Sequence, residues 1–139
     1  MHIVHVEDEK PLKDILKTTL AAFDPNIKMV QFTTAEEALV YIEHNGGTID
    51  LFILDIRLPG PMNGVQLAEK IRQLKCAGNM VITSAFSRPS HDVMTRLNCE
   101  YYRKPWHLVE LMDKLKQYKA KALPKPSLLK PSDPKSYNV

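Results

Sequence analysis

Short apolar runs and amphipathic stretches alternate along the chain. The apolar runs are too short for helices and are rich in β-branched or aromatic residues, which predicts strands at Ile3–Val6, Ile27–Phe32, Leu51–Leu54, Met80–Thr83 and Tyr101–Arg103. Between and after these runs, apolar residues recur at helical spacing, which predicts helices over residues 11–23, 35–45, 65–74, 92–97 and 106–118. The pattern therefore predicts βα units in series.

Local signals add boundaries and a fold class. The second helix has two capping-box registers, Thr33 with Glu36 or Thr34 with Glu37. The run Leu51–Leu54 is uniformly apolar rather than alternating, as a central strand covered on both faces requires. Serial βα units with such a strand predict a doubly wound α/β fold, in which a parallel sheet carries helices on both faces.

Composition narrows the class of protein. The 139 residues are 44% hydrophobic and 25% charged, which is ordinary for one globular domain. No apolar run approaches the roughly 18 residues of a membrane span, and no signal peptide is recognisable at the start, so we expect a cytoplasmic protein without a membrane partner. Cys76 and Cys99 lack the spacing of a zinc or redox motif.

The basic charge is concentrated in the last part of the chain. The formal net charge is +3, and residues 119–139 hold five lysines against the single acid Asp133. We therefore predict a nearly neutral folded domain over residues 1–118 and a disordered, Lys- and Pro-rich tail over residues 119–139. A nearly neutral domain gives no reason to expect direct nucleic-acid binding.

Polar residues with matching chemistry follow four of the predicted strands. They are Glu7 and Asp8, then Asp55, Ser84 and Lys104. In a doubly wound sheet the carboxyl ends of the strands share one edge, where ligands bind. Carboxylates at close range repel one another, so they stay ionised together only with a cation between them, and oxygen ligands suit Mg²⁺ or Mn²⁺. A screened carboxylate such as Asp55 can then attack a phosphoryl group.

Four segments carry a family resemblance. VEDE, LFILDIRLPG, ITSA and RKPW, in this order, resemble the receiver domain of two-component response regulators over residues 2–118. The resemblance implies a flavodoxin-like sheet with strand order 2-1-3-4-5 and five helices. Among receivers, the chain resembles the stand-alone, chemotaxis-regulator type, because few residues remain for an effector domain.

The resemblance also implies a role for each residue around the acceptor. Asp55 would be phosphorylated, Asp8 would bind Mg²⁺ directly, and Glu7 would bind it directly or through water. Arg57 would contribute its backbone carbonyl to the metal. The side chains of Arg57 and Phe86 occupy the positions that tune the lifetime of the phosphoryl group.

Further roles concern the phosphoryl group and the switch. Ser84 would be the hydroxyl that binds the phosphoryl group, with Thr83 as the alternative if the register shifts by one. Lys104 would pair with the phosphoryl oxygens, and the bond between Lys104 and Pro105 would be cis. Tyr101 matches the aromatic residue that moves inward with the hydroxyl.

The sequence also departs from the family pattern. Pro61 lengthens the loop after the acceptor strand, and the segment between Ala85 and Lys104 is short, with Pro89 near its start. We therefore expect a reshaped loop and a short fourth helix. No required group is missing from the site.

The resemblance implies a protein that catalyses only its own phosphorylation and dephosphorylation. Its donor would be a histidine kinase or phosphotransfer protein. Its target would be another protein, bound at the face of helix 4, strand 5 and helix 5. A homodimer could form through the same face. A phosphorylation-independent interaction module is the alternative. A phosphatase of the haloacid dehalogenase type would need an aspartate where Arg57 stands.

Overall fold

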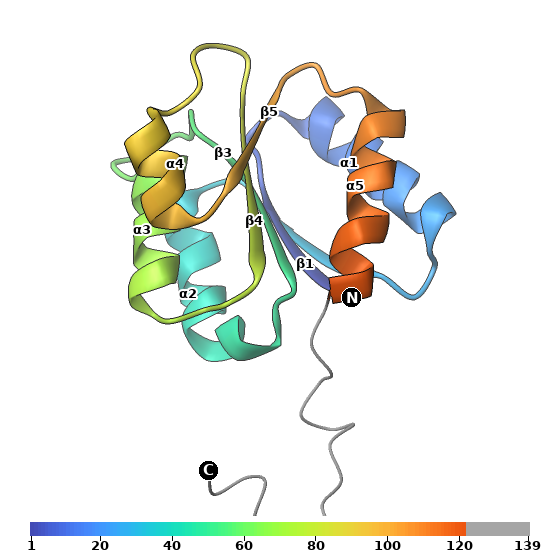
Figure 1. Ribbon diagram of the computed structural model, residues 1–139, viewed down its shortest axis with the longest axis horizontal. Coiled ribbons are helices and arrows are strands. Elements are labelled where there is room, and N and C mark those ends of the chain that lie inside the picture. Colours follow the sequence, from blue (N-terminus) through green and yellow to red (C-terminus); the bar gives the residue numbers. More distant parts are fainter. Residues whose placement is uncertain (122–139) are drawn as a thin grey trace, which may run out of the picture.

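The computed structural model describes residues 1–121, and residues 122–139, which include most of the predicted tail, lie outside the described part. Five parallel strands form one sheet in the order β2-β1-β3-β4-β5 (Figure 1), which confirms the predicted topology. The strands are β1 (His2–Val6), β2 (Lys28–Phe32), β3 (Leu51–Asp55), β4 (Asn79–Ser84) and β5 (Glu100–Arg103).

Helices cover both faces of this sheet. In Figure 1, α1 and α5 lie on one side, and α2, α3 and α4 lie on the other. Their bounds are α1 (Lys10–Phe23), α2 (Ala35–Asn45), α3 (Gly64–Gln73), α4 (His91–Leu97) and α5 (Leu108–Lys121), with a short 3₁₀ helix at Gly46–Thr48. The doubly wound fold predicted from the apolar pattern is therefore confirmed.

Two hydrophobic cores flank the sheet because successive strand residues point to opposite faces. In β3, Phe52 and Leu54 pack on the side of α2, α3 and α4, whereas Leu51 and Ile53 pack on the side of α1 and α5. All residues of β3 are buried, as the uniform run predicted. Asp55 ends this strand, so its carboxylate is carried on a strand whose residues are all buried.

Several boundaries differ from the sequence predictions by a few residues. β2 begins at Lys28 because the N–H of Ile27 is bonded to the carbonyl of Asp24 in the preceding turn. α5 begins at Leu108 rather than Trp106, with the N–H of Leu111 bonded to the carbonyl of His107. The same helix continues to Lys121, three residues beyond the predicted domain end at residue 118.

Side-chain caps explain how two of the helices begin. At α2 the hydroxyl of Thr34 accepts a hydrogen bond from the N–H of Glu37, so the second of the two predicted capping registers is the one used. At α4 the hydroxyl of Ser90 accepts from the N–H of Val93, directly after Pro89. The fourth helix has only seven residues, as expected. Across residues 1–121, no helix is both long and apolar enough to cross a membrane.

Candidate functional site

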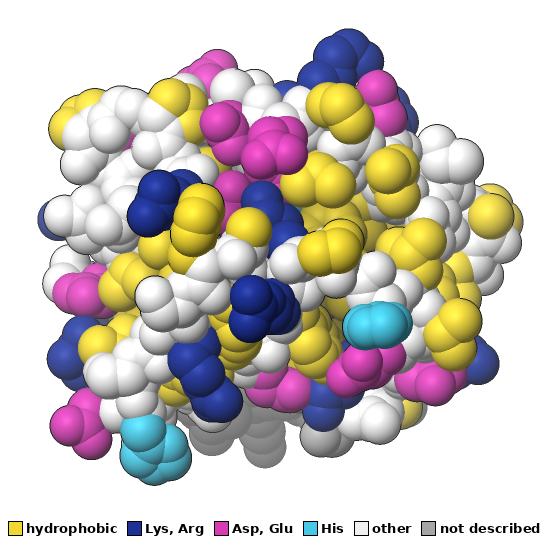
Figure 2. Space-filling view, turned by 90° about the horizontal axis from the view of Figure 1, so that it is seen from above, with side chains coloured by type: hydrophobic (Ala, Val, Ile, Leu, Met, Phe, Trp, Pro, Cys, Tyr) yellow, Lys and Arg dark blue, Asp and Glu magenta, His cyan; other side chains and the backbone are white. Residues whose placement is uncertain are grey.

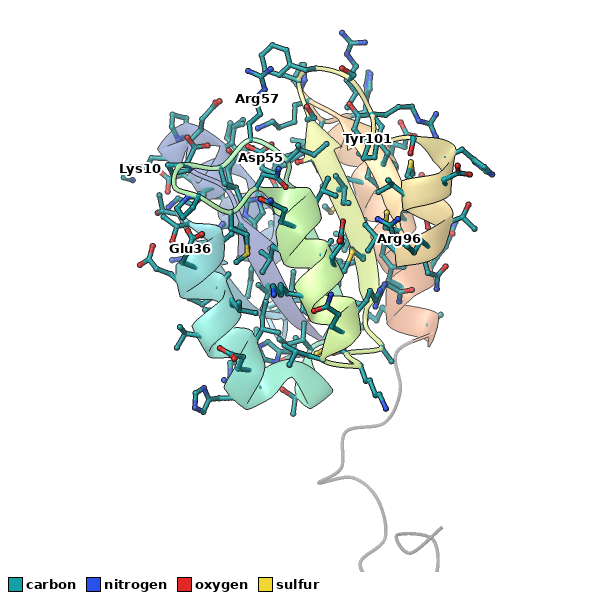
Figure 3. All side chains as sticks on the ribbon, turned by 90° about the vertical axis from the view of Figure 1, so that its left-hand side faces the viewer. Lys10, Glu36, Asp55, Arg57, Arg96 and Tyr101 are labelled. Atoms are coloured by element: carbon teal, nitrogen blue, oxygen red, sulfur yellow. The ribbon has the colours of Figure 1, made fainter. Side chains whose placement is uncertain are left out.

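Three buried charged groups meet at the carboxyl edge of the sheet. Glu7 follows β1, Asp55 ends β3, and Lys104 follows β5. The ammonium of Lys104 donates to Glu7 Oε1 at 2.9 Å and to Asp55 Oδ2 at 3.1 Å. Glu7 is fully buried, Asp55 is 3% exposed and Lys104 8% exposed. Figure 3 shows Asp55 at the end of the sheet, below Arg57.

Burial disturbs the protonation of these groups. It raises the pKa of Glu7 to about 7, against the hydrogen bond from Lys104, and the neighbouring charge of Asp55 raises it further. Burial also raises the pKa of Asp55, although the hydrogen bond and charge of Lys104 oppose the shift. The pKa of Lys104 is raised because its bonds to both carboxylates outweigh its burial. One ammonium thus does not fully compensate two desolvated carboxylates.

The acids at this edge fit a divalent cation. Carboxylate oxygens of Glu7, Asp8 and Asp55 all lie within 4.8 Å of one another. Asp8 is exposed, whereas Glu7 and Asp55 are buried, so the set opens to solvent on the side of Asp8. Hard oxygen donors at this spacing suit Mg²⁺ or Mn²⁺. The raised pKa values of both buried acids agree with a site that is short of positive charge.

A small pocket opens over the acceptor. Its volume is about 130 Å³, and its lining includes Asp8, Asp55, Ser84 and Lys104 together with Glu9, Arg57, Ala85 and Phe86. Figure 2 looks onto this end of the molecule, where acidic and basic side chains lie next to one another near the centre of the face. The predicted residues from four separate strands therefore meet around one cavity.

The two candidate hydroxyls have different surroundings. Ser84 lines the pocket, and its Oγ accepts a hydrogen bond from the N–H of Phe86 at 3.0 Å. Thr83 is buried and absent from the pocket wall, and its hydroxyl has no hydrogen-bond partner within residues 1–121. The geometry therefore favours Ser84 over Thr83 as the hydroxyl available to a bound group.

Arg57 and Phe86 form part of the pocket rim. The guanidinium carbon of Arg57 lies 3.9 Å from the centroid of the Phe86 ring, a cation–π contact. The ring is 56% exposed. Each residue was predicted separately to act near the phosphoryl group, but their stacking against each other was not predicted.

Tyr101 is tied to the loop that follows β4. Its hydroxyl lies 3.0 Å from the carbonyl oxygen of Ser84 and 3.2 Å from that of Phe86. Its ring packs against the core under α2, α3 and α4, while Tyr102 packs against the opposite core, because successive strand residues point to opposite faces. The bond between Lys104 and Pro105 is cis, as the resemblance implied.

Sequence reasoning also missed a hydrogen bond close to the site. The carboxylate of Glu36, in the first turn of α2, accepts a hydrogen bond from the N–H of Met62 in the loop between β3 and α3. The sequence pattern suggests Glu36 only as a partner for Thr33 in a helix cap. No local pattern signals a bond between residues this far apart.

Comparisons with known proteins agree with the fold. The sequence model of the response regulator receiver domain matches residues 3–116. The chain therefore belongs to the receiver domain family of two-component signalling, which consists of signalling domains rather than conventional enzymes.

Individual relatives support the same family. The chain is 32% identical over 117 residues to the regulatory protein VanR of Enterococcus faecium, which covers 82% of this chain and 48% of VanR. It is 32% identical over 74 residues to the cyclic di-GMP phosphodiesterase response regulator RpfG of Xanthomonas campestris pv. campestris (strain 8004), covering 53% of this chain and 19% of RpfG. The chain thus spans less than half the length of either protein.

A solved structure extends the comparison to three dimensions. The response regulator protein TrrA of Thermotoga maritima, in complex with Mg²⁺-BeF, superposes with a TM-score of 0.70 at 30% identity. The match covers 84% of this chain and 97% of TrrA.

Proposed function

We propose that this receiver domain is a phosphorylation-dependent signalling switch that accepts a phosphoryl group on Asp55. The observation that carries the proposal is the contact of the buried Asp55 carboxylate with Lys104, inside a pocket bordered by Asp8 and Ser84. The donor is the phosphohistidine of a histidine kinase or phosphotransfer protein. The receiver acts on no external metabolite and catalyses only its own phosphorylation and dephosphorylation.

The reaction follows from the positions of the charged groups. A carboxylate oxygen of Asp55 attacks phosphorus while the bond to the donor imidazole breaks, and Lys104 places its ammonium beside the oxygens that gain charge. Glu7, Asp8 and Asp55, with the backbone carbonyl of Arg57, would hold Mg²⁺ or Mn²⁺. When bound, the metal ion neutralises charge on the carboxylates and on the transferred group.

The signal would leave the site through Ser84 and Tyr101. Among residues 1–121, the Ser84 hydroxyl makes one hydrogen bond, which it accepts from the N–H of Phe86, so it can turn its proton toward a phosphoryl oxygen. The Tyr101 hydroxyl donates to the carbonyls of Ser84 and Phe86, so movement of the loop after β4 changes the hydrogen-bond partners of this hydroxyl. The change then reaches the surface of α4, β5 and α5, where a target protein or a second copy binds.

The stacked pair of Arg57 and Phe86 would set the lifetime of the phosphoryl group. Both residues line the pocket, and the guanidinium carbon of Arg57 lies over the Phe86 ring. A water molecule that hydrolyses the acyl phosphate must pass this rim. The pair would therefore slow hydrolysis as long as it stays closed.

The test is phosphorylation by a small donor. The protein is incubated with acetyl phosphate and Mg²⁺, and its intact mass is measured with and without chelator. We expect one added phosphate in the wild type and none in Asp55→Asn. A wild-type protein that gains no phosphate, under conditions that label a receiver of known activity, would sink the proposal.

One observation favours a second candidate, a phosphorylation-independent interaction module. Arg72 of α3 donates to the carbonyls of Leu97 and Asn98 at the end of α4, and also to those of Cys76 and Gly78. This clamp restrains the end of α4 on the proposed output face. Target binding that stays the same in Asp55→Ala, with and without phosphodonor, would favour the module over the switch.

A further inference from the structure

The loop between β3 and α3 carries Arg57 past the acceptor site. At its base, the N–H of Ile56 is bonded to the carbonyl of Thr83, and the N–H of Gly64 to the carbonyl of Ile56. Gly60 has φ +91°, a conformation that side-chain-bearing residues rarely adopt. Pro61, which follows it, has no N–H to contribute. The middle of the loop can therefore be fixed only by hydrogen bonds from residues outside the loop.

Glu36 supplies this support. Its Oε2 accepts the N–H of Met62 at 3.0 Å, across 26 residues of sequence. Its Oε1 lies so close to Gly60 that a Cβ built on this glycine would be 2.9 Å away. Within residues 1–121, no other hydrogen bond reaches the stretch from Leu58 to Met62.

We propose that Glu36 is a positioning residue for the metal and phosphoryl site, which it serves by holding the loop that carries Arg57. The proposal rests on the proposed function, because it assigns the Arg57 backbone carbonyl to the metal. Glu36 lies outside the pocket lining, so its effect passes through the loop. Figure 3 shows Glu36 on α2, on the side of the loop away from Asp55.

Two features of Glu36 could matter, its charge and its reach, and conservative variants separate them. Glu36→Gln keeps a carbonyl oxygen at the same reach and removes the charge. Glu36→Asp keeps the charge but is one methylene too short to bond Met62 N–H in the present geometry. If Glu36 acts by position, Gln will substitute for it and Asp will not.

The experiment measures Mg²⁺ binding by titration calorimetry in the full chain. We expect Glu36→Ala and Glu36→Asp to raise the Mg²⁺ dissociation constant about tenfold, as loss of a supporting contact does at other metal sites, and Glu36→Gln to change it by less than about threefold. Glu43→Ala, at an exposed position of the same helix, is the matched control and should bind Mg²⁺ like the wild type.

Amide hydrogen exchange gives a second readout that needs neither metal nor phosphate. The Met62 amide should lose protection in Glu36→Ala and Glu36→Asp and keep it in Glu36→Gln, while amides of β3 remain protected in all variants. Wild-type Mg²⁺ affinity in Glu36→Asp, or weakened affinity in Glu36→Gln equal to that of Asp, overturns the inference. If wild-type Asp55 gains no phosphate, the proposed function fails, but these two readouts still decide the role of Glu36.

Discussion

Two buried polar groups lie at opposite ends of the same strand, β1. At its start, the ring nitrogens of His2 lie 3.1 Å from the Thr48 hydroxyl and 2.9 Å from the Tyr41 hydroxyl, and its N–H donates to Asp50 Oδ2 at 2.7 Å. At its end, Glu7 shares the ammonium of Lys104 with Asp55. Both groups are enclosed, but their chemistry differs.

The difference separates a structural site from the proposed functional one. At the amino end, a ring that is 5% exposed meets neutral hydroxyls, and each ring nitrogen has a partner. At the carboxyl end, burial raises the pKa of Glu7 and of Asp55, so the ionised form of each carboxylate is destabilised. A buried network in which every polar group has a hydrogen-bond partner adds stability. A buried pair of carboxylates with too little positive charge beside it is instead suited to bind a cation and, as we propose, to accept a phosphoryl group.

The largest effect on stability should come from Lys104→Met. This change leaves two buried carboxylates without their ammonium, and breaking a buried charge pair costs about 3 kcal/mol. We expect this loss in urea unfolding without metal, and a partial recovery with Mg²⁺. Lys116→Met, in a pair whose side chains are 67% exposed, is the control and should cost less than about 1 kcal/mol. If Lys104→Met lowers the free energy of unfolding as little as Lys116→Met does, the buried carboxylates do not depend on the ammonium of Lys104.

The next effect is a dependence on pH through Glu7. Its pKa is raised to about 7, so the folded protein holds this proton to higher pH than the unfolded chain does. Without metal, the free energy of unfolding should therefore fall as pH rises from 6.5 to 8. Burial lowers the pKa of His5 from 6.5 to about 3, so the opposite contribution of His5 is confined to lower pH.

Glu7→Gln tests whether Glu7 causes this pH dependence. In the variant, the free energy of unfolding should fall less above pH 6.5 than in the wild type. In the wild type, Mg²⁺ should bind more tightly as pH rises to about 7, because binding displaces the Glu7 proton. Mg²⁺ titrations at several pH values measure this. A fall in stability that persists in Glu7→Gln would assign the titration to another group.

A smaller effect is expected at the amino end. His2→Leu removes the ring contacts with Thr48 and Tyr41, which should cost about 1–2 kcal/mol in urea unfolding. Phosphate uptake at Asp55 should be unchanged, since this edge takes no part in the chemistry. His44→Leu, at an exposed position of α2, is the control. A large loss of phosphate uptake in His2→Leu would show that the two ends of β1 are coupled.

The smallest effect on stability should follow Phe86→Ala. The ring is 56% exposed, and an exposed cation–π contact contributes only about 0.5–1 kcal/mol. The phosphoryl lifetime should nevertheless shorten several-fold, because the rim of the pocket opens. Loss of label after removal of the donor measures this, with Val109→Ala, 77% exposed, as the control. An unchanged lifetime would remove Phe86 from the proposed tuning pair.

Most of the fold was predictable because strands and helices differ in the period of their apolar residues. The uniform run Leu51–Leu54 predicted a central strand, and β3 lies between β1 and β4. His5 in β1 is buried, and its Nδ1 contacts the side-chain amide of Gln31 in β2, as neighbouring strands of a sheet allow. The start of α5 was predicted less well, since apolar spacing does not distinguish Trp106 in a loop from Trp106 in a helix.

The sequence by itself determined which chemical groups stand at the ends of the strands. Because parallel strands bring their carboxyl ends to one edge, the order of the strands and the residues that follow them were enough to place Glu7, Asp8, Asp55 and Lys104 together. Only the tertiary structure decided how they share charge, with one ammonium between two carboxylates. It alone also decided that Glu36 holds the loop, since a bond from a side chain to a distant backbone N–H leaves no period in the sequence.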